Sequence, residues 1–318
     1  MKSFLVFLTL CIALKVSAQE TGFSTDPLDA KFVTSDVDLF WEAFEKVDAA
    51  TENPFEAYLE KGSPGVQGFI EYRIVNADSL LEMVKKRKDD YLASKGVLAD
   101  LESRKKRVQA IYAAMKYWYP DTVFPPIYFV YGRFNTGGTV SDDGLILGVE
   151  MMKNLDGLAG LVAHELIHYQ QKFSIPEADF NLLANVLFEG SADFLGELIS
   201  GDSVESLPHY QYGDKHFQQL ALEFVLSLDN ETNVDWLYGT TGKDDRPNDL
   251  GYWMGYHITK AYFEKADDKK QAIHDILHIG DAKSFLIKSG FLDSQLAQAK
   301  KMTDAEKEAF LRSLHKKD

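Results

Sequence analysis

Hydrophobic residues spaced three and four positions apart predict helices over most of this chain. Residues 36–50 place their apolar side chains on one stripe, and residues 77–119 continue the pattern through two heavily charged helices. Two runs interrupt it, because residues 127–131 (IYFVY) and 145–149 (LILGV) are rich in the β-branched and aromatic side chains of strands. Helical spacing returns at residue 158. The pattern predicts an α+β fold that is mostly helical and contains a small mixed sheet.

A different apolar run opens the chain. Residues 3–14 follow the positively charged Lys2, are too short to cross a bilayer, and lead into small residues that end at Ala18. These features predict a signal peptide, residues 1–18, and export to the periplasm or the extracellular space. A buried N-terminal helix and lipoprotein processing at Cys11 are the weaker alternatives.

The charge balance argues against several classes of partner. The chain has 34 Lys and Arg against 49 Asp and Glu, a net charge of −15. Such a field repels nucleic-acid phosphates and anionic membrane surfaces, so no nucleic-acid partner is expected. No segment after the signal peptide has the length of apolar sequence needed for an integral membrane span. Cleavage would also remove the single cysteine, so the exported protein would rely on core packing and not on disulfides. The oligomeric state does not follow from these features.

The residues with the clearest chemistry lie in an apolar helical segment, residues 158–173, which contains the sequence HELIH. His164 and His168 are four positions apart and share one helix face, so both imidazoles can bind one ion. Glu165 lies about 100° further round the helix, where it can contact a water on that ion. Catalytic zinc sites need such ligands, an open coordination position and a base. The alternative is a histidine pair without a metal, but unpaired polar groups in so apolar a helix would be costly.

A second helical segment, residues 181–200, supplies the candidate third ligand, Glu189. Gly190 and a nearby alanine let this helix approach the first one closely. Glu177 and Glu197 are competing candidates, but neither has such small neighbours. An ordinary surface carboxylate is the alternative interpretation of Glu189.

Asp193 lies one turn after Glu189, on the same helix face. It is placed to accept a hydrogen bond from the free ring nitrogen of His164, which would fix the tautomer of that imidazole.

HExxH followed by Glu189 and Asp193 resembles the gluzincin group of zinc metallopeptidases, and more narrowly the predicted zinc-dependent proteases that bacteria export. The resemblance covers residues 127–263. It implies Glu165 as general base and one zinc ion per chain. The implied zinc ligands are His164, His168 and Glu189.

The resemblance also implies a zincin-like fold, and the change from helical to strand-like sequence after residue 120 divides the chain. A zincin-like catalytic domain with a helical C-terminal part would occupy residues 121–318, with the small sheet beside the active-site helix pair. The helical N-terminal region, residues 19–120, has no implied role.

Gluzincins also need a hydrogen-bond donor for the oxyanion of the tetrahedral intermediate, normally a Tyr or His downstream of the third ligand. The segment GYWMGYH offers three candidates: Tyr252, Tyr256 and His257. The two tyrosines share a helix face and are favoured over the histidine, and aromatic core packing is the alternative. A second polar and aromatic segment, residues 209–216, could line the cleft or lie on ordinary surface.

The segment between the two predicted strands is the candidate substrate-binding edge. Its two consecutive glycines would let another backbone come close, which a strand interior seldom tolerates. We expect it to form an exposed sheet edge beside the zinc that pairs with an extended peptide, and a Gly-Gly hairpin turn is the alternative. Its residues are Asn135, Thr136, Gly137, Gly138 and Thr139.

Together these features predict a secreted or periplasmic zinc metallopeptidase that hydrolyses a peptide or protein substrate. A zinc-bound water would attack the scissile carbonyl, while Glu165 takes its proton and passes it to the leaving amine. The alternative is a non-enzymatic exported zinc-binding scaffold or binding protein with a zincin-like fold. The presence of Glu165 argues against a scaffold, which needs no base.

Overall fold

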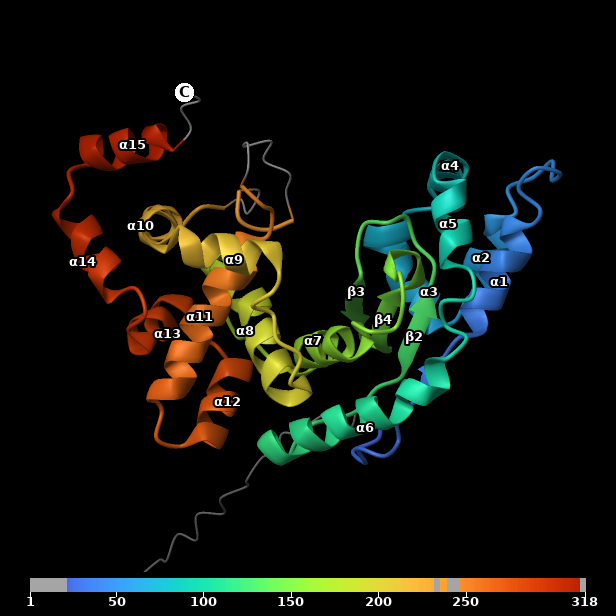
Figure 1. Cartoon of the computed structure of the whole chain (residues 1–318), viewed down its shortest axis with the longest axis horizontal. Helices are drawn as coiled ribbons and strands as arrows, with labels where there is room; N and C mark the ends of the chain where they lie inside the picture. Colours follow the sequence, from blue (N-terminus) through green and yellow to red (C-terminus); the bar gives the residue numbers. More distant parts are fainter. Residues whose placement is uncertain (1–21, 232–234, 239–245, 315–318) are drawn as a thin grey trace, which may run out of the picture.

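A computed structural model of the chain describes residues 22–231, 235–238 and 246–314. The predicted signal peptide and Cys11 lie outside the described residues. Within them the protein is mostly helical with one four-stranded mixed sheet, which confirms the predicted α+β class (Figure 1). None of the described helices is both long enough and apolar enough to cross a membrane.

The N-terminal part contains six α-helices and one π-helical segment among the described residues. They are α1 (Ser35–Phe44), α2 (Phe55–Lys61), α3 (Pro64–Phe69), the π-helix η1 (Ile70–Ile74), α4 (Ala77–Lys86), α5 (Lys88–Ser94) and α6 (Leu101–Trp118). Residues 77–119 form three helices and not the two predicted, because the chain also breaks at Arg87 between α4 and α5. The break predicted at Lys95-Gly96 is present, with Gly96 in the left-handed conformation.

The sheet has the strand order β1-β2-β4-β3. Its strands are β1 (Phe32–Val33), β2 (Ile127–Val130), β3 (Gly138–Ser141) and β4 (Gly144–Gly148). β1, β2 and β4 are parallel, and β3 is antiparallel to β4 and forms the edge. The sequence pattern missed β1, because two residues are too few to show a period.

Helices cover both faces of the sheet, which explains why every residue of β2 and β4 is buried. Side chains alternate between the faces along a strand. A Cβ atom at Gly138 would contact Glu165 of helix α7 (Leu158–Gln170), whereas Ser141 and Ile146 contact α3 at Gly68. Therefore α7, which carries the HExxH sequence, packs on one face of the sheet and α3 on the other.

Buried tyrosines tie the N-terminal helices to the end of β2. The Tyr58 hydroxyl donates to the carbonyl of Tyr131 and accepts from its N–H, both at 3.0 Å. The Tyr91 hydroxyl donates to the carbonyl of Gly132 at 2.6 Å. Phe40 stacks on the Tyr131 ring at 4.1 Å. The chain that leaves β2 toward β3 therefore starts from a fixed position. The division of the chain at residues 120 and 121 stays a prediction.

In the C-terminal part, every regular element among the described residues is a helix. After the 3₁₀ turn η2 (Val149–Met151) and α7, its elements are η3 (Glu177–Asp179), α8 (Leu182–Ser200), α9 (Pro208–Lys215), α10 (Phe217–Ser227), α11 (Leu250–Lys265), α12 (Lys269–Leu277), α13 (Ala282–Ser289), α14 (Asp293–Lys301) and α15 (Asp304–Ser313). Figure 1 shows α7 and α8 between the sheet and the C-terminal helices.

Helices α8 and α11 cross at two glycines. A Cβ atom at Gly190 would lie 2.2 Å from the backbone carbon of Gly255, and one at Gly255 would lie 1.9 Å from the carbonyl oxygen of Val186. This crossing therefore requires glycine at both positions. It also fixes Glu189, the neighbour of Gly190, against the helix that carries Tyr252.

A buried carboxylate supports the chain between β2 and β3. Glu150 is 5% exposed; its Oε1 accepts the N–H of Phe134 at 3.2 Å, and its Oε2 has no hydrogen-bond partner among the described residues. Burial raises the pKa of this carboxyl group to about 7.

We expect Glu150→Gln to change how the free energy of unfolding depends on pH. Because the folded-state pKa of Glu150 is raised, its stabilising contribution is complete below pH 4.5 and is lost as the pH rises through 7. Glutamine does not ionise, so the variant avoids this loss. The free energy of unfolding of the variant minus that of wild type should therefore rise by about 3 kcal/mol between pH 4.5 and pH 8.5. Urea unfolding across this range measures the difference, and parallel curves for the two proteins would contradict the prediction.

Candidate metal centre

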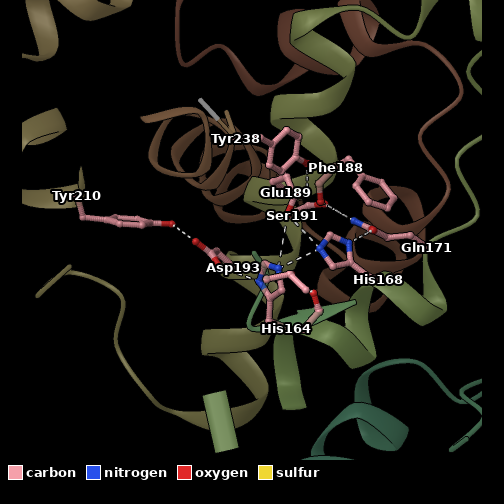
Figure 2. A network of polar contacts seen from close by, with 11 residues as sticks. His164, His168, Gln171, Phe188, Glu189, Ser191, Asp193, Tyr210 and Tyr238 are labelled. Atoms are coloured by element: carbon pink, nitrogen blue, oxygen red, sulfur yellow. Dashed lines mark hydrogen bonds and ion pairs between the residues drawn. The ribbon is translucent and has the colours of Figure 1, made fainter. Parts of the chain in front are cut away.

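Three side chains from α7 and α8 converge on one point (Figure 2). The Nε2 atoms of His164 and His168 are 2.9 Å apart, and Oε2 of Glu189 lies 3.1 Å from Nε2 of His168 and 3.5 Å from Nε2 of His164. Among the described residues, these three form a group whose ligand atoms all lie within 4.8 Å of one another.

The distances between these atoms suit a tetrahedral zinc ion. Two ligand atoms at zinc–ligand distances near 2.1 Å in a tetrahedron lie about 3.4 Å apart. The three observed separations of 2.9, 3.1 and 3.5 Å surround that value. Two imidazoles and one carboxylate are also a usual donor set for catalytic zinc. The residues therefore fit the metal.

A carboxylate orients the first histidine from behind. Oδ1 of Asp193 lies 2.8 Å from Nδ1 of His164, and its Oδ2 accepts the Tyr210 hydroxyl at 2.7 Å. An acceptor at Nδ1 places the proton there and leaves the Nε2 lone pair directed at the point of convergence. The sequence argument anticipated the place of Asp193 but not that of Tyr210.

An amide does the same for the second histidine. Oε1 of Gln171 lies 2.7 Å from Nδ1 of His168. Its Nε2 donates to the Phe188 carbonyl at 2.7 Å and to the Ser191 hydroxyl at 2.9 Å, which fixes the orientation of the amide. Gln171 follows α7 directly, and no feature of the sequence distinguishes it from its neighbours.

The groups at the point of convergence favour a positive charge. Burial lowers the pKa of His164, but hydrogen bonds with Asp193 and Glu189 outweigh burial and raise this pKa well above its usual value. Burial raises the pKa of Glu189, but the two histidines outweigh it and hold this pKa well below its usual value. A divalent cation would supply the charge that these groups favour.

Glu165 lies beside the converging atoms and not among them. Its side chain is buried and lines a cavity of about 600 Å³ next to His164. Strand β3 passes directly over it, because a Cβ atom at Gly138 would lie 2.3 Å from its Oε1. Burial raises the pKa of Glu165, and the two neighbouring histidines oppose the rise. A buried carboxylate in this position is suited to accept a proton near neutral pH.

The structure separates the three candidate oxyanion donors. Tyr252 lines the cavity, and its ring stacks on His164 with 6.0 Å between ring centres. Tyr256 is buried against Tyr210 and does not line the cavity. His257 also lies outside the cavity lining, where it contacts a different carboxylate, Asp214, at 3.2 Å.

Tyr238 reaches the site without having been anticipated. Its hydroxyl donates to Oε1 of Glu189, so that only Oε2 of Glu189 is directed at the histidines. Its backbone has φ 57°, a left-handed conformation that is uncommon for tyrosine, and its N–H donates to Asp249 at 2.9 Å. Its place depends on a loop with no periodic pattern, so no sequence signal could have found it.

Only part of the predicted substrate-binding segment lines the cavity. Thr136, Gly137 and Gly138 line the cavity, and Thr139 lies on the edge strand β3 with Gly138. Asn135 does not line the cavity, because its amide donates to the carbonyl of Arg73 at 3.0 Å.

The competing third-ligand candidates lie elsewhere. Glu177 is exposed on η3, and Glu197 lines the cavity without belonging to the converging group. In the segment 209–216, His209 lines the cavity. Tyr212 and His216 do not line it, and their rings stack on each other with 4.2 Å between ring centres.

We expect Asp193→Ala to weaken zinc affinity by about 10- to 100-fold, because His164 would lose the acceptor that fixes its ring. Competition with a chromophoric chelator measures the affinity, and circular dichroism checks that the variant is folded. Asp214→Ala is the matched control, since Asp214 also contacts a histidine but lies away from the converging atoms. Equal zinc affinities for Asp193→Ala and wild type would contradict the expected role.

Residues 132–283 of the chain match the family described as "Predicted Zn-dependent protease (DUF2268)". The match includes α7, α8 and all three converging residues. No curated protein and no solved structure shows a significant match to the chain. The description of the family suggests a zinc-dependent protease.

Proposed function

We propose that this protein is an exported zinc-dependent peptidase with one zinc ion per chain. The observation that carries the proposal is the convergence of His164, His168 and Glu189 beside the buried carboxylate of Glu165, at the wall of an open cavity. When bound, zinc lowers the pKa of a coordinated water to about 7 and polarises a carbonyl oxygen.

Glu165 performs the proton transfers in this proposal. It accepts a proton from the attacking water as the bond between the water oxygen and the scissile carbonyl carbon forms. It then delivers that proton to the amine nitrogen as the carbon–nitrogen bond breaks, which returns Glu165 to its ionised form. Tyr252, which lines the cavity beside His164, is the favoured donor to the oxyanion of the intermediate.

Strand β3 would bind the substrate backbone. The N–H of Gly148 donates to the Gly137 carbonyl at 2.9 Å, which makes these two residues a hydrogen-bonded pair. In an antiparallel ladder such pairs alternate, so the main-chain groups of Gly138 and Val140 point away from β4. They lie on the sheet edge next to Glu165, where an extended peptide could add as a further strand.

A non-enzymatic zinc-binding scaffold is the alternative function. The buried Glu165 favours the enzyme, because a carboxylate held at the wall of the cavity without being a ligand has no use in a purely structural metal site. Export rests on the signal-peptide pattern of residues 1–18.

We expect His168→Ala to abolish stoichiometric zinc binding, since the two remaining ligands cannot hold the ion. Zinc content after dialysis, measured by atomic absorption, tests this. His278→Ala is the matched control, because His274 and His278 are also four residues apart but lie outside the converging group. If His168→Ala retains one zinc per chain, the assignment of the site is wrong. An unbiased peptide-library digest by the zinc-loaded wild-type protein then separates a peptidase, which cleaves, from a scaffold, which does not.

A further inference from the structure

The cavity continues beyond the converging residues along α7 and α8. Near the metal centre, α7 and α8 pack closely at Gly196. A Cβ atom at this position would lie 3.4 Å from the backbone nitrogen of His164. Further from it, a Cβ atom at Gly160 would lie 3.6 Å from Oδ2 of Asp202, which follows the end of α8. Both glycines and Gly157 line the cavity, so the helices leave space there that larger side chains would fill.

The remote end of the cavity, around Gly157, Gly160 and Glu197, has both apolar and acidic walls. Leu161, Val204 and Leu207 contribute apolar surface. Three carboxylates line the same end: Asp156, Glu197 and Asp202. No Lys or Arg lines the cavity among the residues that the structure describes.

Two of the three carboxylates are paired with arginines that do not line the cavity. Arg107 lies 3.2 Å from Asp202, and Arg104 lies 3.5 Å from Asp156. Glu197 has no Lys or Arg within ion-pair distance in the described part of the chain. Its Oε2 accepts the N–H of Val204 at 3.2 Å, which fixes the carboxylate at the cavity wall.

We propose that this remote end is a subsite for a Lys or Arg side chain of the peptide substrate, and that Glu197 determines this specificity. The aliphatic stem of a basic side chain would cover Leu161 and Val204, while its charged end reaches the carboxylates. The net charge of −15 would also attract basic peptides from solution. The inference rests on the proposed peptidase function and adds the substrate class to it.

The test compares lysine with norleucine, which has the same length of stem and no charge. Synthetic peptides carry one lysine at successive positions, each with a norleucine counterpart, and the zinc-loaded protein is assayed for kcat/KM on every pair. We expect lysine to be preferred by about tenfold at one position relative to the cleaved bond. Glu197→Gln, which keeps the acceptor for Val204, should reduce that ratio to near one.

Glu205→Gln is the matched control, because it removes the same charge from an exposed residue outside the cavity and should leave the ratio unchanged. Binding gives a readout independent of turnover. In a Glu165→Gln background, fluorescence anisotropy should show tighter binding of the lysine peptide, and Glu197→Gln should abolish the difference.

The outcomes separate the subsite from the proposed function. Cleavage without preference for lysine at any position, or a preference that Glu197→Gln leaves intact, would overturn the subsite while the peptidase function stands. If the zinc-loaded protein cleaves no peptide at all, the proposed function is wrong and the subsite falls with it.

Discussion

Glu165→Gln should lower kcat/KM for peptide cleavage by about 10²-fold or more while zinc content stays at the wild-type level. The amide matches the carboxylate in size and helix propensity but cannot accept the proton of the attacking water, and general bases contribute rate factors of this order. Since Glu165 lies outside the converging group, its replacement should leave the metal in place. Single-substrate kinetics and metal analysis on the same preparation give both quantities.

Glu177→Gln is the control for this variant, because Glu177 is exposed on η3 and belongs to neither the cavity wall nor the converging group. It should cleave peptides at the wild-type rate. Turnover by Glu165→Gln equal to that of the control would exclude Glu165 as the base. Loss of zinc from Glu165→Gln would instead assign the residue to metal binding.

Gly255→Ala should destabilise the protein by about 3 kcal/mol or more, a large share of the 5–15 kcal/mol typical of a folded domain. The added methyl group would lie 1.9 Å from the carbonyl oxygen of Val186, so α11 would have to move away from α8. Because the atom in the way belongs to the backbone, no side-chain rotation can relieve the contact. Urea unfolding measures the loss of stability.

Gly160→Ala is the matched control for this substitution. Gly160 also lies within a helix, and a Cβ atom there would make an ordinary contact of 3.6 Å with Asp202. Alanine should therefore stabilise the protein by up to about 1 kcal/mol through helix propensity. A Gly255→Ala variant as stable as wild type would show that α8 and α11 can pack without the close approach at this residue.

The fold class could be predicted because it follows from local periodicity. The apolar stripe of residues 36–50 reflects the burial of one helix face, which recurs at every helical turn. The strand-like run of residues 127–131 reflects burial within a sheet. Strand β1 escaped prediction for the same reason, since Phe32–Val33 is shorter than any period. Its place depends on pairing with β2, almost a hundred residues later in the chain.

The features of the candidate site also fall into those that local spacing predicts and those that it does not. Helix geometry alone places His164 beside His168, and Glu189 beside Asp193, because residues four apart share a face. Only the packing of α7 against α8 brings these two pairs together, through contacts between residues far apart in sequence.

The remaining features have no local cause and were decided by the tertiary structure. The hydroxyl of Tyr238 reaches Glu189 from another part of the chain, and Gly138 lies over Glu165 because the edge strand crosses α7. Side-chain spacing encodes which residues of one helix can act together. Which helices, strands and loops meet depends on how the whole core packs, and spacing along the chain does not specify that.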